Sequence, residues 1–229
     1  GTSTEYWTRA SSLLHSSVDG LVDIPLDHRV RLYVFVGAQH GVWSYTNKGY
    51  FDNCINPLDH RPPMRALLSH LVRWISNKAL PPKSVFPKIK DKTLGLVSSW
   101  QSAFPKISSL RLPSQNLAPP RLYLGERWSE GIIDIVPPEF GLPFVTLVPM
   151  SDQDGIDMGG IRLPAVAAPL GTYLGWNLRN WKLGKPSYVG RWSGSFVPFA
   201  LNKGAHGPKN DPRPSIKSRY ENRQDYLSA

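Results

Sequence analysis

A run of β-branched and aromatic residues, RVRLYVFV at positions 29–36, constrains the fold of this 229-residue chain more than any other stretch. Apolar residues occupy both of its alternating faces, which is typical of an interior strand in a parallel sheet that is covered on each side. The run therefore predicts a buried strand from Val30 to Val36. It stops at Gly37, and an ionisable side chain, His40, follows three residues later.

Helices are predicted on both sides of this strand. In TEYWTRASSLLH, at positions 4–15, apolar residues recur at helical spacing, and Glu5 lies near the start, where a carboxylate favours the helix dipole. At positions 62–77 a longer set of apolar residues recurs at helical spacing behind two prolines, which is a strong signal for a helix start. The order helix, strand, helix indicates a sheet with helices packed on it, so the second helix is expected to pack against the strand.

The composition changes near residue 80, and most of the 22 prolines lie beyond it. Because proline removes a backbone donor and interrupts helices, this half is expected to hold short strands and ordered loops, with few helices. Four features are predicted there. They are strands in GIIDIVPP (131–138) and FVTLVPM (144–150), a turn in SDQDGIDMGG (151–160) and a last short helix in SIKSRYENRQDYL (215–227).

Charge and motif content narrow the classes of function. The net charge is +10, but the basic residues are spread along the chain, so no nucleic-acid partner is expected. No stretch approaches the roughly 18 uninterrupted apolar residues of a membrane helix, so no membrane span is expected. The single cysteine, Cys54, excludes an internal disulfide and a multi-cysteine zinc site. Glycine-rich nucleotide-binding motifs are absent, so no cofactor is expected, and no signal specifies a compartment or an oligomeric state.

Three carboxylates gather in the SDQDGIDMGG turn, at Asp152, Asp154 and Asp157. A calcium loop of the EF-hand type needs carboxylates at alternating positions before its glycine and a glutamate at its end, and this spacing differs. A hairpin turn built on Asp154 and Gly155 is therefore predicted, with no metal site.

His40 follows the carboxyl end of the predicted strand. Reactive groups of open α/β sheets lie on loops at this end, because the strand fixes the backbone while the side chain stays accessible. Gly37 and Gly41 flank the histidine and would permit a close approach by a substrate. A histidine here could also cap the strand or satisfy a loop hydrogen bond, so its position alone leaves a structural role open.

Several segments carry a family resemblance and together span nearly the whole chain. They include TSTEYW (2–7), RVRLYVFVGAQHG (29–41), NPLDHRPPMRALLSHLVRWI (56–75), RLP (111–113), GIRLPAVAAPLGTYLGWNLR (160–179), GSFVPFA (194–200) and DPRPSIKSRY (211–220). In these segments the chain resembles bacterial α/β-hydrolase-domain proteins. The resemblance implies an α/β fold in two parts. Residues 1–80 would be a C-terminal fragment of an α/β-hydrolase sheet, with its last strand and flanking helices, and residues 81–229 a β-rich, proline-rich extension.

The resemblance also implies a catalytic triad, which in this superfamily runs Ser, then Asp or Glu, then His in chain order. His40 matches the position of the general base, and Glu5 matches the position of the carboxylate that orients it. A serine hydroxyl is a poor nucleophile until a neutral imidazole accepts its proton, and the carboxylate stabilises the imidazolium that forms. Glu5 also has a structural explanation as a helix-start carboxylate, and three further acids lie between the two residues. They are Asp19, Asp23 and Asp27.

The nucleophile elbow G-x-S-x-G occurs nowhere in the sequence, and its serine should precede the acid. We therefore expect a C-terminal piece of a serine-type hydrolase of carboxylic esters or related acyl bonds, with the serine and the oxyanion hole upstream of Gly1. By the same resemblance, Trp43, Tyr173 and Trp176 are expected to line an apolar pocket for a small-molecule substrate. The alternative is a non-catalytic, β-rich binding module in residues 81–229 with a basic, aromatic surface.

Overall fold

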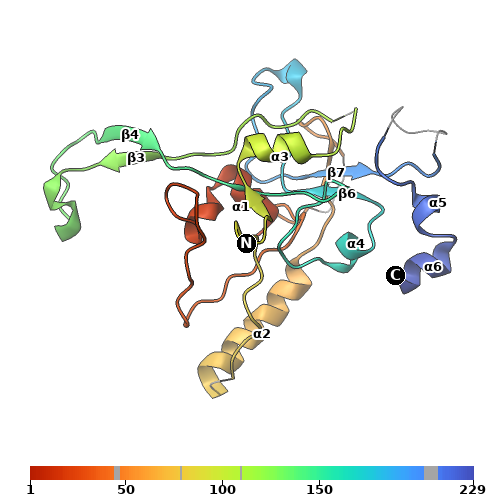
Figure 1. The fold of residues 1–229 in the computed structure, drawn as a ribbon, viewed down its shortest axis with the longest axis horizontal. Helices are drawn as coiled ribbons and strands as arrows, with labels where there is room; N and C mark the ends of the chain where they lie inside the picture. Colours follow the sequence, from red (N-terminus) through yellow and green to blue (C-terminus); the bar gives the residue numbers. More distant parts are fainter. Residues whose placement is uncertain (44–46, 78, 109, 204–210) are drawn as a thin grey trace.

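The computed structural model describes residues 1–43, 47–77, 79–108, 110–203 and 211–229. In these ranges the strands form three small antiparallel sheets, ordered β1-β7-β6, β2-β5 and β3-β4 (Figure 1). The strands are β1 (Cys54–Ile55), β2 (Leu94–Gly95), β3 (Pro120–Tyr123), β4 (Glu139–Pro143), β5 (Val148–Pro149), β6 (Gly171–Leu174) and β7 (Ser195–Pro198). The α-helices are α1 (Ser3–Thr8), α2 (Arg61–Asn77), α3 (Val97–Ala103), α4 (Pro164–Ala167), α5 (Ile216–Arg219) and α6 (Arg223–Ser228), and the 3₁₀ helices are η1 (Ser11–Leu14), η2 (Glu126–Glu130) and η3 (Trp181–Leu183).

The first predicted strand is an extended segment with isolated bridges rather than a continuous strand. Phe35 forms parallel bridges with Thr2 on one edge and with Ile161 on the other, and Tyr33 forms a parallel bridge with Val85. The prediction of parallel neighbours on both edges is therefore confirmed at Phe35, and Tyr33 has one parallel neighbour. Each bridge is only one residue pair long, because the neighbouring segments turn away on either side.

Burial of this extended segment is uneven. Val34, Phe35 and Val36 are buried, as predicted, whereas Val30 is 45% exposed. The prediction of a buried strand over the whole of residues 30–36 is therefore wrong for its first half. The buried half is the part that leads to His40.

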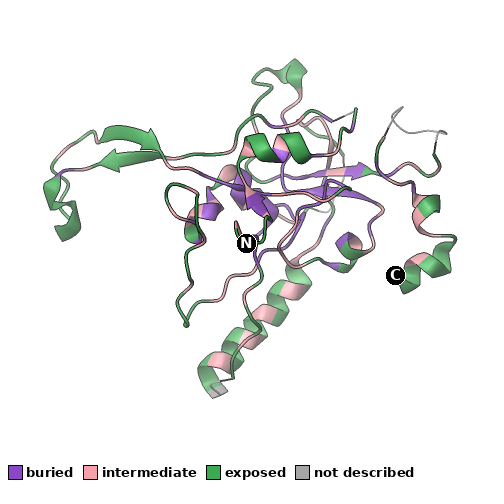
Figure 2. Cartoon of the chain, viewed as in Figure 1, coloured by how far each residue is buried: buried purple, intermediate pink, exposed green. Residues whose placement is uncertain are grey.

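The core consists of three buried clusters, each of which combines residues from both sides of residue 80. Buried segments gather at the centre of the molecule, around α1, β6 and β7 (Figure 2). One cluster is built around Trp7, Trp100 and Trp176, with ring centroids 4.8 Å apart for the first two and 6.0 Å apart for Trp7 and Trp176. The division into residues 1–80 and 81–229 stays a prediction based on composition, because residues from both parts contribute to each buried cluster.

The first predicted helix is interrupted. Helix α1 ends at Thr8, and the 3₁₀ helix η1 begins at Ser11. Between them Ala10 has a φ of +53°, in the left-handed region, which a continuous right-handed helix cannot include. The prediction of one helix across residues 4–15 is therefore wrong, although both halves are helical.

The helix predicted at residues 62–77 is confirmed as α2. It projects from the rest of the molecule (Figure 1), and Leu67 packs partly against the buried cluster that contains Phe35. Trp74 is partly buried, with the guanidinium of Arg31 5.0 Å from its ring centroid. Five other apolar residues on α2 face solvent, so the prediction that this helix packs against the strand is wrong for most of its length. Their exposed fractions are 51% for Met64, 59% for Leu68, 44% for Leu71, 55% for Val72 and 74% for Ile75. None of the helices in the described ranges combines the length and apolar content that crossing a bilayer requires.

An apolar groove of about 550 Å³ lies between α2 and the extended segment, and we call it the α2 groove. It is lined by Gly1, residues 29–33, Phe35, Met64, Leu67, Leu68, Leu71, Trp74 and Pro81. Exposed apolar surfaces of this kind are typical of interaction sites in soluble proteins.

The second half is less regular than predicted. Residues 131–138 form no strand, and they lie between β3 and β4, which pair with each other in a hairpin that extends from the centre (Figure 1). Of residues 144–150 only Val148 and Pro149 form a strand, β5. The strands after residue 80 are two to five residues long, so the expectation of short strands holds, while the predicted strand at 131–138 is wrong.

Two other predictions in this half concern the turn at residues 151–160 and the last helix. The turn at SDQDGIDMGG is confirmed, since Ser151 and Asp157 form an antiparallel bridge and Gly155 has a φ of +77°. The last helix is split into α5 and α6, because Tyr220 is extended and ends the first of them. The rings of Tyr220 and Tyr226 nevertheless pack together, with their centroids 5.1 Å apart.

Two leucines test where the stability of this chain resides. Leu174 is fully buried and Leu68 is 59% exposed. We expect Leu174→Ala to lower the free energy of unfolding by about 2–5 kcal/mol, because it leaves a cavity. Leu68→Ala should change it by about 0.5 kcal/mol or less. Urea denaturation of both variants measures the difference, and equal losses would contradict this description of α2.

Candidate active site

His40 and Glu5 form a pair at the end of the buried half of the extended segment. The Nδ1 atom of His40 lies within hydrogen-bond distance of Glu5 Oε1. The Glu5 side chain is 16% exposed, and the imidazole is 35% exposed, so solvent reaches the histidine more easily than the acid. Glu5 lies in the first turn of α1 and also accepts a hydrogen bond of 2.6 Å from the backbone N–H of Thr2.

A contact between Ser3 and Gly37 brings the two segments of the pair together. The backbone N–H of Gly37 donates to Ser3 Oγ at 2.9 Å. Gly37 has a φ of +68°, and a Cβ atom there would lie 2.8 Å from the carbonyl oxygen of Tyr173. Both the backbone conformation and the close approach therefore require glycine. Three residues further on, the chain presents His40 to Glu5.

Two buried amides hold the loop that contains His40. Gln39 donates from Nε2 to the carbonyl of Asn56 at 2.6 Å and accepts from the N–H of Gly194 at 2.8 Å. Asn56 donates in turn to the carbonyls of Gly37, at 2.6 Å, and Leu174, at 3.1 Å. Sequence reasoning missed both residues. The signal in the sequence was a polar amide next to apolar residues, Gln39 in AQHG and Asn56 in CINPL.

The electrostatic environment keeps Glu5 ionised. Burial opposes its charged form, but hydrogen bonds from Thr2 and His40 outweigh burial and hold the pKa of Glu5 below its usual value. An ionised carboxylate can only accept hydrogen bonds, so the proton of a neutral His40 lies on Nδ1. The Nε2 atom then carries the lone pair, and the pair can act as a base oriented by an acid.

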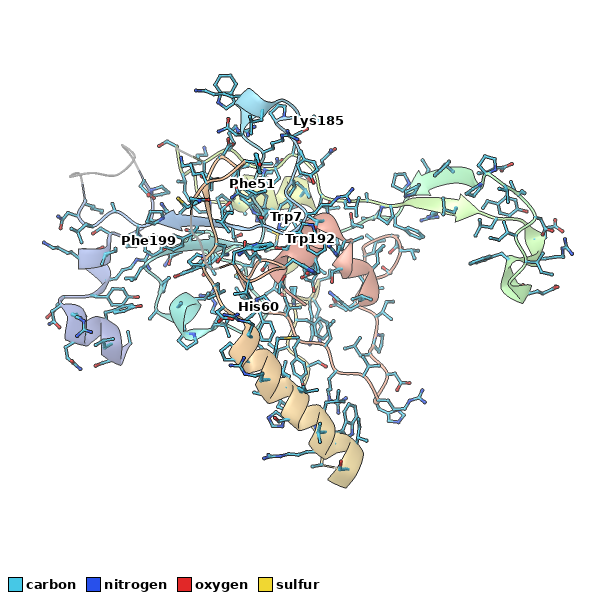
Figure 3. All side chains as sticks on the ribbon, turned by 180° about the vertical axis from the view of Figure 1, so that it is seen from behind. Trp7, Phe51, His60, Lys185, Trp192 and Phe199 are labelled. Atoms are coloured by element: carbon cyan, nitrogen blue, oxygen red, sulfur yellow. The ribbon has the colours of Figure 1, made fainter. Side chains whose placement is uncertain are left out.

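The indole of Trp192 borders the histidine. The rings of Trp192, labelled in Figure 3, and His40 pack edge to face with centroids 4.5 Å apart. The guanidinium of Arg9 lies over the same indole, 4.6 Å from its centroid. Trp192 is 50% exposed, so part of its ring faces solvent beside His40.

Comparison with known proteins bears on this arrangement. A family model described as an alpha/beta hydrolase domain matches residues 8–229. This chain belongs to the α/β-hydrolase-domain family. The matched range includes His40 and begins three residues after Glu5. Searches of curated proteins and of solved structures found no match.

The three residues expected to line a substrate pocket lie in different environments in this α/β-hydrolase chain. Trp43 is 38% exposed and lies three residues after His40 in the chain. Its ring packs against Gly41, since a Cβ atom added to Gly41 would lie 3.1 Å from it. Tyr173 is 7% exposed and packs against Phe196, whereas Trp176 is fully buried. Their roles stay predictions, and Trp43 is the most exposed of the three.

The three alternative acids bond groups other than His40. They are Asp19, Asp23 and Asp27. Among the four acids considered, the structure thus places Glu5 against His40.

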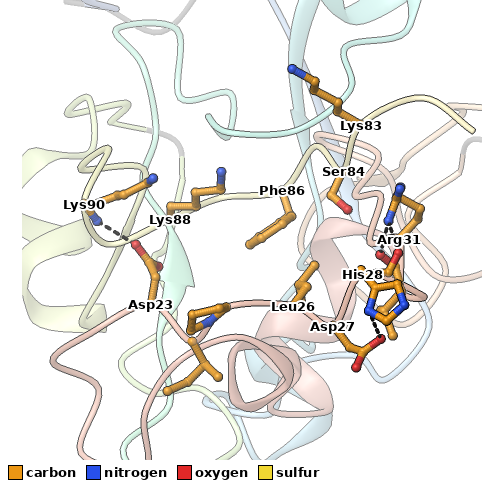
Figure 4. Close-up of a pocket in the computed structure, with 13 residues that line it drawn as sticks. Asp23, Leu26, Asp27, His28, Arg31, Lys83, Ser84, Phe86, Lys88 and Lys90 are labelled. Carbon is orange, nitrogen blue, oxygen red and sulfur yellow. Dashed lines mark hydrogen bonds and ion pairs between the residues drawn. The ribbon is translucent and has the colours of Figure 1, made fainter. Parts of the chain in front are cut away.

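Figure 4 shows a second hollow, of about 460 Å³. Lys83, Lys88 and Lys90 line it, and Asp23 accepts hydrogen bonds at its edge from the N–H groups of Ile89 and Lys90. Glu5 and His40 are absent from its lining. The hollow therefore plays no part in the arrangement described above.

The carboxylates of the 151–160 turn are occupied by arginines or buried. Asp152 pairs with Arg162, and Asp154 pairs with Arg219. Within the described ranges, no group of three or more histidine, cysteine or acidic side chains is arranged to hold a metal ion.

Titration with calcium should accordingly leave the melting temperature of the chain unchanged. A ligand that binds the folded state would raise the melting temperature as its concentration increases, and such a rise would contradict the prediction of a turn without a metal site.

The third carboxylate of this turn, Asp157, is buried in the core. It is 1% exposed, and in the described part of the chain neither of its carboxyl oxygens has a hydrogen bond of standard geometry. Burial raises the pKa of Asp157 to about 7, and Asp152 adds to the rise, while the hydroxyls of Ser3 and Ser151 oppose it. The group is therefore largely neutral in mildly acidic solution.

The raised pKa predicts how stability depends on pH. Because an unfolded aspartate has a pKa of about 3.9, the folded chain binds the extra proton between about pH 4 and pH 7. The contribution of this proton to the free energy of unfolding is present below about pH 4 and lost as the pH rises to about 7. We expect Asp157→Asn to unfold with a smaller decrease between pH 5 and pH 8, by a few kcal/mol at most.

Urea denaturation at several pH values, with the exposed Asp91→Asn as control, measures this difference. The control should follow the unsubstituted chain. A pH dependence of Asp157→Asn identical to that of the control would show that Asp157 ionises normally.

Proposed function

We propose that this chain is the C-terminal part of a serine-type hydrolase that acts on carboxylic esters or a related acyl bond. In this proposal His40 is the general base and Glu5 the acid of the triad, and the serine lies upstream of residue 1. One observation carries the proposal. His40, whose loop begins at Gly37, lies against the ionised, half-buried carboxylate of Glu5, at the end of an extended segment that forms parallel bridges. Membership of the α/β-hydrolase-domain family supports the reaction class.

The pair would act by moving one proton. As the serine oxygen attacks the ester carbonyl, Nε2 of His40 accepts the hydroxyl proton, and Glu5 stabilises the imidazolium. When the tetrahedral intermediate collapses, the same proton passes to the departing alcohol oxygen, which leaves an acyl-serine. Water then repeats the two transfers, releasing the carboxylic acid and regenerating the serine and the neutral imidazole.

Unpaired backbone next to Gly1 supports a missing upstream strand. Gly1 donates to the carbonyl of Tyr33 and accepts from the N–H of Phe35, which is one step of a parallel ladder. The next step of such a ladder would use the carbonyl of Arg31 and the N–H of Tyr33. Neither group has a hydrogen bond in the described ranges. Both border the α2 groove, so an additional strand there would satisfy them and cover the apolar face of α2.

We expect substitutions of the pair to remove activity from the protein that includes its upstream reading frame. His40→Ala should lower kcat by on the order of 10⁶-fold, because the serine loses its base, and Glu5→Gln by on the order of 10⁴-fold. His28→Ala is the control, since His28 is 87% exposed, and it should keep the activity within about twofold. Hydrolysis of a series of carboxylic esters gives the rates.

The result of this experiment also separates the two functions considered. Retention of most activity in His40→Ala would contradict the catalytic role. An unrelated domain upstream, without a G-x-S-x-G elbow, would favour a binding module instead.

The α2 groove gives a second test that needs no activity. In the 229-residue chain Leu68→Ala should cost about 0.5 kcal/mol or less, because the side chain is mostly exposed. In the longer protein the same substitution should cost about 2 kcal/mol or more, if a strand buries it. Urea denaturation of both forms measures the change. An unchanged cost would contradict a strand in the α2 groove.

A further inference from the structure

A third hollow, of about 580 Å³, borders the end of α1, and we call it the α1 hollow. Most of its lining residues are polar or charged, whereas the α2 groove is mostly apolar. This difference indicates a ligand with polar groups. The α1 hollow is lined by Trp7, Thr8, residues 115–118, Lys185, residues 187–189 and Arg191.

The α1 hollow lies close to the active-site pair. Thr8 follows Glu5 by three residues in α1, and residues three apart lie on the same face of a helix. The hydroxyl of Thr8 donates to the carbonyl of Arg191 at 3.4 Å. The next residue in the chain, Trp192, packs edge to face against His40. The segment that lines the hollow is therefore continuous with the segment that borders the catalytic histidine.

Arg9 connects these two segments. Its Nη1 atom donates to Thr8 Oγ1 and to the carbonyl of Arg191, both at 3.1 Å. Its guanidinium lies over the indole of Trp192, 4.6 Å from the ring centroid. Because Trp192 is 50% exposed, its ring offers an apolar surface on which the chain of a ligand could lie between His40 and the hollow.

The charges at the α1 hollow favour an anion. Lys185 and Arg191 line it, and among the described residues neither side chain pairs with an acid. In the same ranges no acidic residue belongs to the lining. Ammonium and guanidinium groups form strong, charge-assisted hydrogen bonds with carboxylate and phosphate oxygens. Two cations without acidic partners are thus available to an anionic ligand.

Trp7 adds an unsatisfied donor to the lining. It is 1% exposed, and its Nε1 atom has no hydrogen-bond partner in the described part of the chain. A buried donor without an acceptor is unfavourable, and native structures rarely retain one. An anionic oxygen bound against Trp7 could accept this hydrogen bond. Trp7 and Lys185 are labelled with Trp192 in Figure 3.

We propose that the α1 hollow binds an anionic group, a carboxylate or a phosphate, carried by the ester that the Glu5–His40 pair cleaves. The inference deepens the proposed function and rests on it for the reaction. Lys185 and Arg191 bind the anionic oxygens, and the chain of the ester lies along Trp192. The ester carbonyl then lies at the exposed histidine, and neutral esters bind less tightly.

The first experiment measures binding to the 229-residue chain and needs no hydrolysis. Three probes are titrated and followed by NMR, namely monomethyl adipate, its analogue with a phosphate in place of the carboxylate, and the neutral methyl hexanoate. We expect an anionic ester to bind more tightly than methyl hexanoate, and the tighter of the two anionic probes identifies the anion. Sodium chloride should weaken this binding, because salt screens exposed charges.

Substitutions of the two cations test the site itself. Lys185→Gln and Arg191→Gln should each weaken binding of the anionic ester about tenfold, because each removes a charged donor. Lys217→Gln and Arg223→Gln are the matched controls, since both residues are exposed and neither lines the hollow. The controls should leave the affinity within about twofold of the unsubstituted chain.

A second experiment measures specificity in the protein with its upstream region. We expect kcat/KM to be higher for the anionic ester than for methyl hexanoate. Arg191→Gln should lower kcat/KM for the anionic ester about tenfold, mainly by raising KM, because the lost contact contributes to binding rather than to the proton transfer. The same substitution should leave the rate with methyl hexanoate within about twofold.

The outcomes separate this inference from the proposed function. Absence of binding, equal binding of anionic and neutral esters, or unchanged affinity in both Lys185→Gln and Arg191→Gln would overturn the anion site. Hydrolysis of all three esters with equal kcat/KM would overturn it as well, while the hydrolase proposal stands. A chain that binds anionic esters through these two residues, in a protein that hydrolyses no ester, would retain the anion site and contradict the hydrolase proposal.

Discussion

The hydrogen bond from the Gly37 N–H to Ser3 Oγ joins the two segments on which the candidate active site depends. Ser3 begins the helix that carries Glu5, and Gly37 ends the extended segment that leads to His40. Two hydrogen bonds from Gly1 to the extended segment and the bridge between Thr2 and Phe35 align the two segments over one step of a parallel ladder. The bond from Gly37 continues this alignment at the end next to the site, where Gly37 adopts a left-handed conformation.

Buried polar side chains supply hydrogen bonds that a larger sheet would otherwise provide. Asn56 bonds two backbone carbonyls near the site, and Arg213 donates to Thr172 Oγ1 and to the carbonyl of Val197 beside β6 and β7. Burying such groups costs free energy unless their hydrogen bonds are satisfied. The positions of these side chains are thus strongly coupled to the loops they bond, which gives short strands a defined arrangement.

Local patterns predicted local structure, and they failed where the outcome depends on a distant partner. The helix α2 was predicted because its apolar spacing and its prolines act within the helix itself. Its packing was not, because packing depends on which surface the rest of the chain places beside the helix, and apolar spacing carries no information about that surface. Residues 131–138 have the composition of a strand, but the neighbouring β3 and β4 pair with each other and leave this segment as their connection.

The same distinction applies to the site. His40 could be singled out from the glycines around it and from the strand that precedes it. Glu5 came from family resemblance, because 35 residues separate it from His40 and no spacing rule links them. Gln39 and Asn56 could not be found in either way, because each acts by bonding backbone that a distant segment brings close. The residues that support an active site thus come from elements that meet only in the folded chain.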